Sequence, residues 1–287
     1  MKKYTCNISD VALTAIAPAI WGSTYFVTTQ FLPYGYPMHV AMLRALPAGL
    51  LLLLFVRRLP FGIWWGRAFF LGGLNFAVFW AMLFVAAYRL PGGVAATVGA
   101  VQPLIVIALS RVFLARPIRA MAIAAGIIGM AGVAFLVVTP HAALDPVGIA
   151  AALAGAVSMA FGTVLTRKWQ PPVSSLTFTA WQLTAGGLLL VPVAWCLEPA
   201  LPTLSAANIL GLAYLGLIGA AFTYLLWFRG LSRIEPSVAA SLGFLSPVTA
   251  TLLGWLALGQ SLAPAQIAGF VMVLSSVWLS QKSQAPR

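Results

Sequence analysis

The most informative residues are two prolines, each of which lies four residues after a glycine. Pro103 follows Gly99, and Pro247 follows Gly243. Inside a helix, proline has no N–H to donate to the carbonyl four residues earlier, and its ring crowds that carbonyl. Glycine at the earlier position lets the backbone tilt and turn the freed carbonyl toward a partner in protein, water or ligand. We therefore predict that Pro103 and Pro247 are hinges and that both glycines contact a ligand.

A further set of side chains offers hydrogen-bonding groups and aromatic walls. Gln102 and Ser246 each stand directly before a hinge proline and add an amide and a hydroxyl. A cavity of aromatic walls with few polar groups suits a compact, partly apolar ligand. The remaining candidates for contact with such a ligand are Trp21, Tyr25, Asn75, Phe79, Trp80, Phe161 and Tyr224.

Both sets of residues also fit a packing role. Small residues let membrane helices approach one another closely. Tryptophan and tyrosine near helix ends often anchor a protein at the membrane surface. The sequence leaves this alternative open at each position.

Ionisable residues are too few and too scattered for enzymatic chemistry. The 287-residue chain has four Asp or Glu and two His. It shows no nucleophile–base pair, metal-ligand cluster or phosphate-binding loop, so we expect neither an enzyme nor a bound cofactor. Asp145 and Glu235 each precede a proline and are expected to cap helices, while Asp10 and Glu198 lie near other helix ends. None of the four carboxylates is expected mid-membrane, where proton relays usually place such groups.

Arg44 is the exception among the charged residues, because it falls within an apolar stretch. Two interpretations remain open. Its long side chain can reach the membrane surface, or its guanidinium can be a buried anchor for a carboxylate. We favour a structural role.

The elements that must position these residues are transmembrane helices. Hydrophobic residues make up 62% of the chain and charged residues 7%, whereas a soluble domain carries about 25% charged residues. A bilayer core of about 30 Å needs ~20 mostly apolar residues in a helix. Ten such stretches can be marked, separated by short connections: Val11–Phe31, Met38–Val56, Phe69–Ala87, Gly92–Leu114, Ala120–Val138, Pro146–Leu165, Leu176–Cys196, Ile209–Phe228, Pro236–Leu258 and Pro264–Leu279.

The distribution of Lys and Arg predicts the orientation of these helices. Of the 16 basic residues, 14 fall in connections on one side, Arg89 falls on the other, and Arg44 lies within a span. Connections rich in Lys and Arg stay in the cytoplasm. We therefore expect both termini to be cytoplasmic and interpret the net charge of +12 as a topology signal rather than a nucleic-acid surface.

Segments 94–103 and 238–247 indicate an internal repeat. They are 144 residues apart and identical at five of ten positions. Arg89 and Arg233 keep the same offset. A similar match joins Trp21-Gly22-Ser23 to Phe161-Gly162-Thr163.

The repeat divides the chain into residues 1–140 and 141–287, each with five expected helices. Because five is an odd number, the second copy must lie upside down in the membrane relative to the first. The predicted fold is an all-α integral membrane protein of ten helices in two inverted repeats. Such repeats usually place a ligand site at their interface near the midplane.

Together these features resemble the drug/metabolite transporter superfamily, specifically its ten-helix type built from two EamA-like domains. The resemblance rests on Trp21-Gly22-Ser23, on the Val-Ala-Ala…Gly…Pro motifs, and on residues 214–228 (Tyr214-Leu215-Gly216…Tyr224-Leu225-Leu226-Trp227-Phe228). It implies export of amino acids, nucleotide-like metabolites or drugs through a central cavity, and the inverted repeats imply that transport uses alternating access. Exporters of neutral and aromatic amino acids, of the YddG type, are the nearest in character by analogy of fold.

The resulting expectation is an exporter in a bacterial inner membrane, working down the gradient of its substrate. Its partners would be a small-molecule substrate and the lipid bilayer, with no nucleic acid and no obligatory protein partner. A membrane-embedded enzyme and a lipid-handling protein are the alternatives from other classes. An enzyme would need ionisable groups that converge, and the peripheral carboxylates argue against that.

Overall fold

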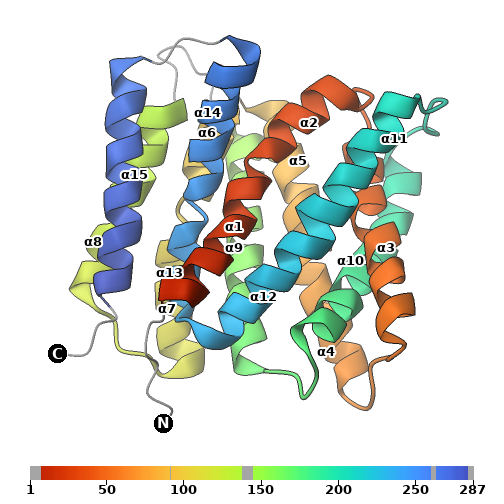
Figure 1. Cartoon of the computed structure of the whole chain (residues 1–287), viewed down its shortest axis with the longest axis horizontal. Coiled ribbons are helices and arrows are strands. Elements are labelled where there is room, and N and C mark those ends of the chain that lie inside the picture. Colours follow the sequence, from red (N-terminus) through yellow and green to blue (C-terminus); the bar gives the residue numbers. More distant parts are fainter. Residues whose placement is uncertain (1–7, 91, 138–144, 260–262, 284–287) are drawn as a thin grey trace.

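Apolar runs form helices throughout the residues that the computed structural model describes, which are 8–90, 92–137, 145–259 and 263–283. No strand occurs within these ranges, so the all-α prediction is confirmed for them. Figure 1 shows the helices side by side in one bundle. They are α1 (Ile8–Trp21), α2 (Ser23–Phe31), α3 (Pro37–Val56), α4 (Trp64–Gly72), η1 (Gly73–Val78), α5 (Phe79–Arg89), α6 (Gly92–Gly99), α7 (Gln102–Leu114), α8 (Ala120–Val137), α9 (Pro146–Lys168), α10 (Ser175–Leu197), α11 (Ala206–Ala213), η2 (Tyr214–Phe222), α12 (Thr223–Arg233), α13 (Pro236–Leu242), α14 (Leu245–Leu258) and α15 (Pro264–Lys282).

Several of these elements join end to end into longer helices that suit a bilayer. Eight such helices in the described ranges are long and apolar enough to cross a membrane. A ninth apolar helix, Ala120–Leu136, is shorter. The eight are Ile8–Phe31, Pro37–Val56, Trp64–Ala86, Ala95–Leu114, Pro146–Lys168, Ser175–Leu197, Ala206–Arg233 and Pro236–Ala257. The chain is therefore an integral membrane protein.

Both hinge prolines follow a break in their helix. α6 ends at Gly99 and α7 begins at Gln102, while α13 ends at Leu242 and α14 begins at Leu245. Tighter bonds from residue i+3 to residue i cross both breaks. The Leu104 N–H donates to the Val101 carbonyl over 3.0 Å, and the Ser246 N–H donates to the Gly243 carbonyl over 3.1 Å. The missing proline N–H thus interrupts both helices near their middle.

Two π-helical segments also occur at matching places. Shifting η1 by the 144 residues that separate the proline motifs places it inside η2. The same shift places Asn75 of η1 on Gly219 of η2. A π-helical turn bonds each N–H to a carbonyl five residues earlier and often marks a functional position.

Close packing of small residues joins the two outer pairs of helices, α3 with α10 and α8 with α15. A Cβ added at Gly49 of α3 would lie 2.4 Å from the backbone nitrogen of Thr184, and one at Gly187 of α10 would lie 2.7 Å from Leu46. Glycine is therefore needed where α3 and α10 touch. Figure 1 places α8 and α15 at one side of the bundle and α3 and α10 at the other.

The cap predictions have mixed outcomes. Asp145 caps α9 as expected, because its Oδ1 accepts hydrogen bonds from Val147 N at 2.7 Å and Gly148 N at 3.2 Å. Glu235 occupies the N-cap position of α13 as expected, but its predicted capping role is wrong, since its carboxylate makes no cap hydrogen bond to α13. Instead it lies 3.4 Å from the guanidinium of Arg116, whose charge outweighs a neutral backbone donor.

Candidate functional site

A cavity of about 290 Å³ lies between helices that the sequence places in different halves of the chain. α5, α6, α7 and α8 line it from one half, and α9, α13 and α14 line it from the other. Seven of the residues singled out in the sequence lie in its wall: Phe79, Gly99, Gln102, Pro103, Gly243, Ser246 and Pro247. The breaks in both proline-containing helices therefore face one shared space.

The wall of this cavity is mostly apolar. Much of it consists of alanine, as at Ala96, Ala100 and Ala156, and Phe79 supplies an aromatic face. Gln102 and Ser246 contribute the side-chain hydrogen-bonding groups. Few polar groups on an apolar wall can orient a compact ligand through its polar end while the rest of the ligand is desolvated.

Three other candidates, Trp21, Trp80 and Tyr224, pack into a closed aromatic cluster instead of lining the cavity. The ring centroids of Trp21 and Tyr224 lie 4.9 Å apart, and those of Phe76 and Tyr224 lie 4.5 Å apart. Trp80 lies 5.2 Å from Phe76, and both Trp80 and Tyr224 are only 2% exposed. The indole of Trp21 donates a hydrogen bond to Thr223 over 2.9 Å. In this conformation the cluster holds α1, α5 and α12 together.

The last three candidates have separate positions. Asn75 is 1% exposed and donates through Nδ2 to Oε1 of Gln182 over 2.7 Å. Phe161 packs against Phe113, with ring centroids 5.9 Å apart. The side chain of Tyr25 lies outside the described residues.

Arg44 is buried in the protein, so the surface-reaching interpretation is wrong. It is 6% exposed, and its guanidinium lies 4.7 Å from the centre of the Trp80 ring. One terminal nitrogen donates to the carbonyl of Gly219 over 2.7 Å. Because Gly219 lies in η2, the π-helical segment provides an acceptor for this charge.

Matching polar contacts tie each π-helical segment to a neighbouring helix. Arg44 of α3 bonds Gly219 of η2, and Gln182 of α10 bonds Asn75 of η1. Arg44 and Gln182 match at an offset of 138 residues, which also sets residues 49–52 on residues 187–190, and Asn75 and Gly219 match at the offset of 144 residues. Sequence reasoning missed both contacts, although two polar residues at matching positions inside apolar stretches were a usable signal.

Two carboxylates lie at the end of the bundle where α3 and α9 begin. Glu198 accepts hydrogen bonds from the backbone of Met38 at 2.6 Å and His39 at 2.9 Å, and its Oε2 lies 2.7 Å from Nδ1 of the His39 ring. Asp145 lies 3.2 Å from Arg89. Hydrogen bonds from the backbone N–H groups of Gly148, chiefly, and Val147 hold the pKa of Asp145 below its usual value, and Arg89 acts in the same direction.

A bundle of membrane helices with a cavity between broken helices is an arrangement common in one class of integral membrane proteins, those that move solutes. The comparisons identify the family within it. The sequence profile of the EamA-like transporter family matches residues 9–138 and 146–281. The chain belongs to this family and is a membrane transporter.

Individual relatives agree with this assignment. The chain is 47% identical over 267 residues to Protein PecM of Dickeya dadantii (strain 3937), covering 92% of this chain and 90% of PecM. It is 33% identical over 261 residues to the uncharacterized inner membrane transporter YedA of Escherichia coli (strain K12), covering 84% of each. A solved crystal structure of a protein shares the fold with a TM-score of 0.82 at 19% identity, covering 95% of this chain and 96% of that one.

Proposed function

We propose that this transporter exports compact, partly apolar metabolites, with neutral and aromatic amino acids as the substrate class. The observation that carries the proposal is the shared cavity, whose wall contains Gln102 and Ser246 beside the two helix breaks. An amide and a hydroxyl can bond the polar end of an amino acid. The apolar wall and Phe79 then accept its side chain.

The proposed architecture is ten membrane spans in two inverted domains, residues 1–140 and 141–287. Matching π-helical segments and matching helix breaks support an internal repeat. α8 and α15 complete the count as the fifth helix of each domain. The two matched family segments, 9–138 and 146–281, follow the same division.

The proposed mechanism is alternating access, in which the two domains rock about the site between them. The breaks before Pro103 and Pro247 supply the bending points, since a helix bends most easily where a backbone bond is missing. A Cβ added at Gly99 would meet no atom of a neighbouring helix within 4 Å in the part of the chain that the structure describes. Gly99 therefore borders open space and not a packed helix.

We propose that both termini face the cytoplasm of a bacterial cell and that the protein lies in the inner membrane. Fourteen basic residues fall in connections on the proposed cytoplasmic side and one, Arg89, falls on the other side, which supports this orientation. The relative YedA is itself named an inner membrane transporter.

We further propose that transport runs down the substrate gradient without obligatory proton exchange. The cavity wall, as far as the structure describes it, contains no Asp, Glu or His. Protons and substrate therefore have no shared site in this conformation at which they could compete. The buried pair of His39 and Glu198 belongs to the start of α3, where the carboxylate caps the helix.

Counterflow in proteoliposomes tests the proposal. Vesicles preloaded with one unlabelled amino acid should accumulate the radiolabelled form transiently. Gln102→Ala and Ser246→Ala should each weaken apparent affinity about three- to tenfold, the effect of one lost hydrogen bond. Gln30→Ala is the matched control, because Gln30 is exposed on α2 away from the cavity.

Other outcomes of the same vesicles would favour the rival classes. Translocation of labelled phospholipid without amino-acid counterflow would favour a lipid-handling protein. Chemical conversion of a solute would favour an enzyme. Counterflow that is unaffected by both cavity substitutions would contradict the proposed site.

A further inference from the structure

Each of the four carboxylates in the chain pairs with a basic residue from the opposite half of the sequence. Three of the carboxylates lie in residues 141–287, and their partners lie in residues 1–140. The fourth, Asp10, lies in the first half, and its partners lie in the second. The pairs are Asp10 with Arg229 and Arg233, Glu235 with Arg116, Asp145 with Arg89, and Glu198 with His39. Since the chain has no other acid, all of its carboxylate ion pairs hold the two halves together.

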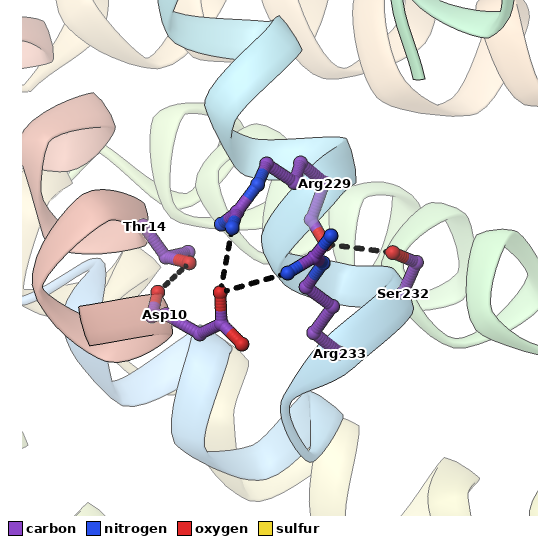
Figure 2. A network of polar contacts seen from close by, with 5 residues as sticks. All are labelled: Asp10, Thr14, Arg229, Ser232 and Arg233. Atoms are coloured by element: carbon purple, nitrogen blue, oxygen red, sulfur yellow. Dashed lines mark hydrogen bonds and ion pairs between the residues drawn. The ribbon is translucent and has the colours of Figure 1, made fainter. Parts of the chain in front are cut away.

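The pair of Asp10 and Arg229 is the tightest of these contacts between Asp and Arg, and Arg233 joins it over a longer distance (Figure 2). Oδ1 of Asp10 lies 2.8 Å from Arg229 and 3.4 Å from Arg233. Ser232 donates to the backbone carbonyl of Arg229 over 2.7 Å, and Thr14 donates to that of Asp10 over 2.6 Å. The Asp10 side chain is 14% exposed and that of Arg229 is 27% exposed. One carboxylate thus joins α1 to two successive turns of α12.

A related pair occupies the opposite end of the bundle. Arg89 ends α5 and lies 3.2 Å from Asp145, at the start of α9. Arg233 ends α12 in the same way, 144 residues later, and reaches Asp10 in the first turn of α1. The side chain of Arg89 is 50% exposed, much like that of Arg233 at 52%, but Asp145 is 33% exposed and Asp10 only 14%. At the 144-residue offset, the residue that corresponds to Arg229 in the first half is Val85. Asp145 therefore has no second arginine equivalent to Arg229.

The cavity approaches the Arg89 end more closely than the Asp10 end. Ala86 lies in its wall only three residues before Arg89, about 4.5 Å along the helix axis. Toward the Asp10 end, the nearest wall residue of α13 is Ala240, five residues after Glu235, about 7.5 Å along the helix axis.

The contact between α1 and α12 beneath the ion pairs is equally tight. A Cβ added at Gly230 would lie 2.2 Å from the hydroxyl oxygen of Thr14, which is fully buried. The two helices therefore cannot come closer. Because α1 and α12 belong to different halves of the chain, the proposed rocking of the halves would separate them when the cavity opens toward this end. Separation would break the ion pairs of Asp10.

We propose that Asp10, Arg229 and Arg233 are a latch that keeps the cavity closed at the end where α1 begins. The latch opens when the cavity changes sides, while the Arg89–Asp145 pair becomes buried in its place. This inference rests on the proposed alternating access. The second arginine makes the latch the stronger of the two contacts, so the resting protein favours closure at the Asp10 end.

Two-sided labelling of a cavity cysteine tests the latch. The probe is Ala100→Cys, in the cavity wall, in a chain with Cys6→Ser and Cys196→Ser. A membrane-impermeant thiol reagent is applied to intact cells and to inverted vesicles. Asp10→Asn removes the charge and keeps the size of the side chain. It should raise the rate of labelling from the α1 end about fivefold and lower that from the opposite end.

Two further variants make the result specific. Asp145→Asn is the matched control, because it removes the same charge at the opposite end of the bundle and should not raise labelling from the α1 end. The double variant Asp10→Lys with Arg229→Glu exchanges the two charges and should restore slow labelling from the α1 end. If Asp10→Asn fails to fold, Arg229→Val carries the test, because it installs the residue at the matching position of the first half.

The outcomes separate this inference from the proposed function. Labelling needs no substrate, so a failed amino-acid screen leaves the test intact. Unchanged labelling from the α1 end in both folded Asp10→Asn and folded Arg229→Val would overturn the latch. Faster labelling from both ends together would also overturn it, because a latch shifts access from one end to the other.

Discussion

Replacing the two hinge prolines with alanine tests whether the helix breaks serve transport. Alanine restores one N–H, which can donate to the carbonyl of Gly99 in the first half or Gly243 in the second. A backbone hydrogen bond of this kind contributes about 1 kcal/mol net. That favours an unbroken helix about fivefold over the broken form. We expect Pro103→Ala or Pro247→Ala to slow flux by about this factor, and the double variant by about 25-fold if the sites act independently.

The assay is initial counterflow rate per folded molecule in proteoliposomes, with folded yield measured by size-exclusion chromatography. Pro47→Ala is the matched control, since Pro47 also lies inside a helix, faces outward on α3 and does not line the cavity. Flux should fall more than folded yield for the hinge variants and stay unchanged for the control. Unchanged flux in both single variants and in the double variant would reduce the Gly–Pro motif to a packing feature.

Three further predictions concern stability and topology. A double-mutant cycle of Asn75→Leu and Gln182→Leu should give a coupling free energy of about 0.6–1.7 kcal/mol, measured by thermal unfolding in detergent; zero coupling would show that their hydrogen bond does not stabilise the fold. Arg44→Met should change the unfolding free energy by no more than about 1 kcal/mol, because an apolar side chain replaces a buried charge; a loss of several kcal/mol would contradict this. Cysteines introduced at Tyr34 and Lys168 should react with an impermeant reagent in intact cells at Tyr34 only, and labelling at Lys168 would refute the topology.

Sequence was a good guide to the helix breaks and to much of the cavity wall. Proline lacks an N–H in any environment, so a break near Pro103 and Pro247 depends only on local chemistry. The repeat then placed the two breaks at matching positions, and their neighbours Gln102 and Ser246 lie in one cavity wall. Whether these residues bind substrate stays a prediction.

The aromatic candidates show what sequence could not supply. Helical spacing places Trp21 and Tyr224 on a face, but only tertiary packing decides whether that face meets a cavity or another helix. In this structure Trp21 packs against Tyr224, and Tyr224 packs in turn against Phe76. For Arg44, the acceptor is a backbone carbonyl in a π-helical segment, and hydropathy patterns carry no signal for such a segment.

The ion pairs between the halves were missed for a related reason. Capping depends on neighbours in sequence, so Asp145 could be predicted as a cap from the proline that follows it. Its pairing with Arg89 and the pairing of Asp10 with Arg229 join residues from distant parts of the chain. The match between Arg89 and Arg233 in the repeat was the one usable hint.

The central claim is that this protein moves a small metabolite down the gradient of that metabolite. Its most direct test is counterflow measured with and without a proton gradient. Proteoliposomes loaded with a neutral or aromatic amino acid are first assayed with no ion gradient, and then with an inward proton gradient, with and without an ionophore. We predict counterflow in the first condition and no concentrative movement in the second. Concentrative movement that appears only with the gradient and is abolished by the ionophore would contradict the claim.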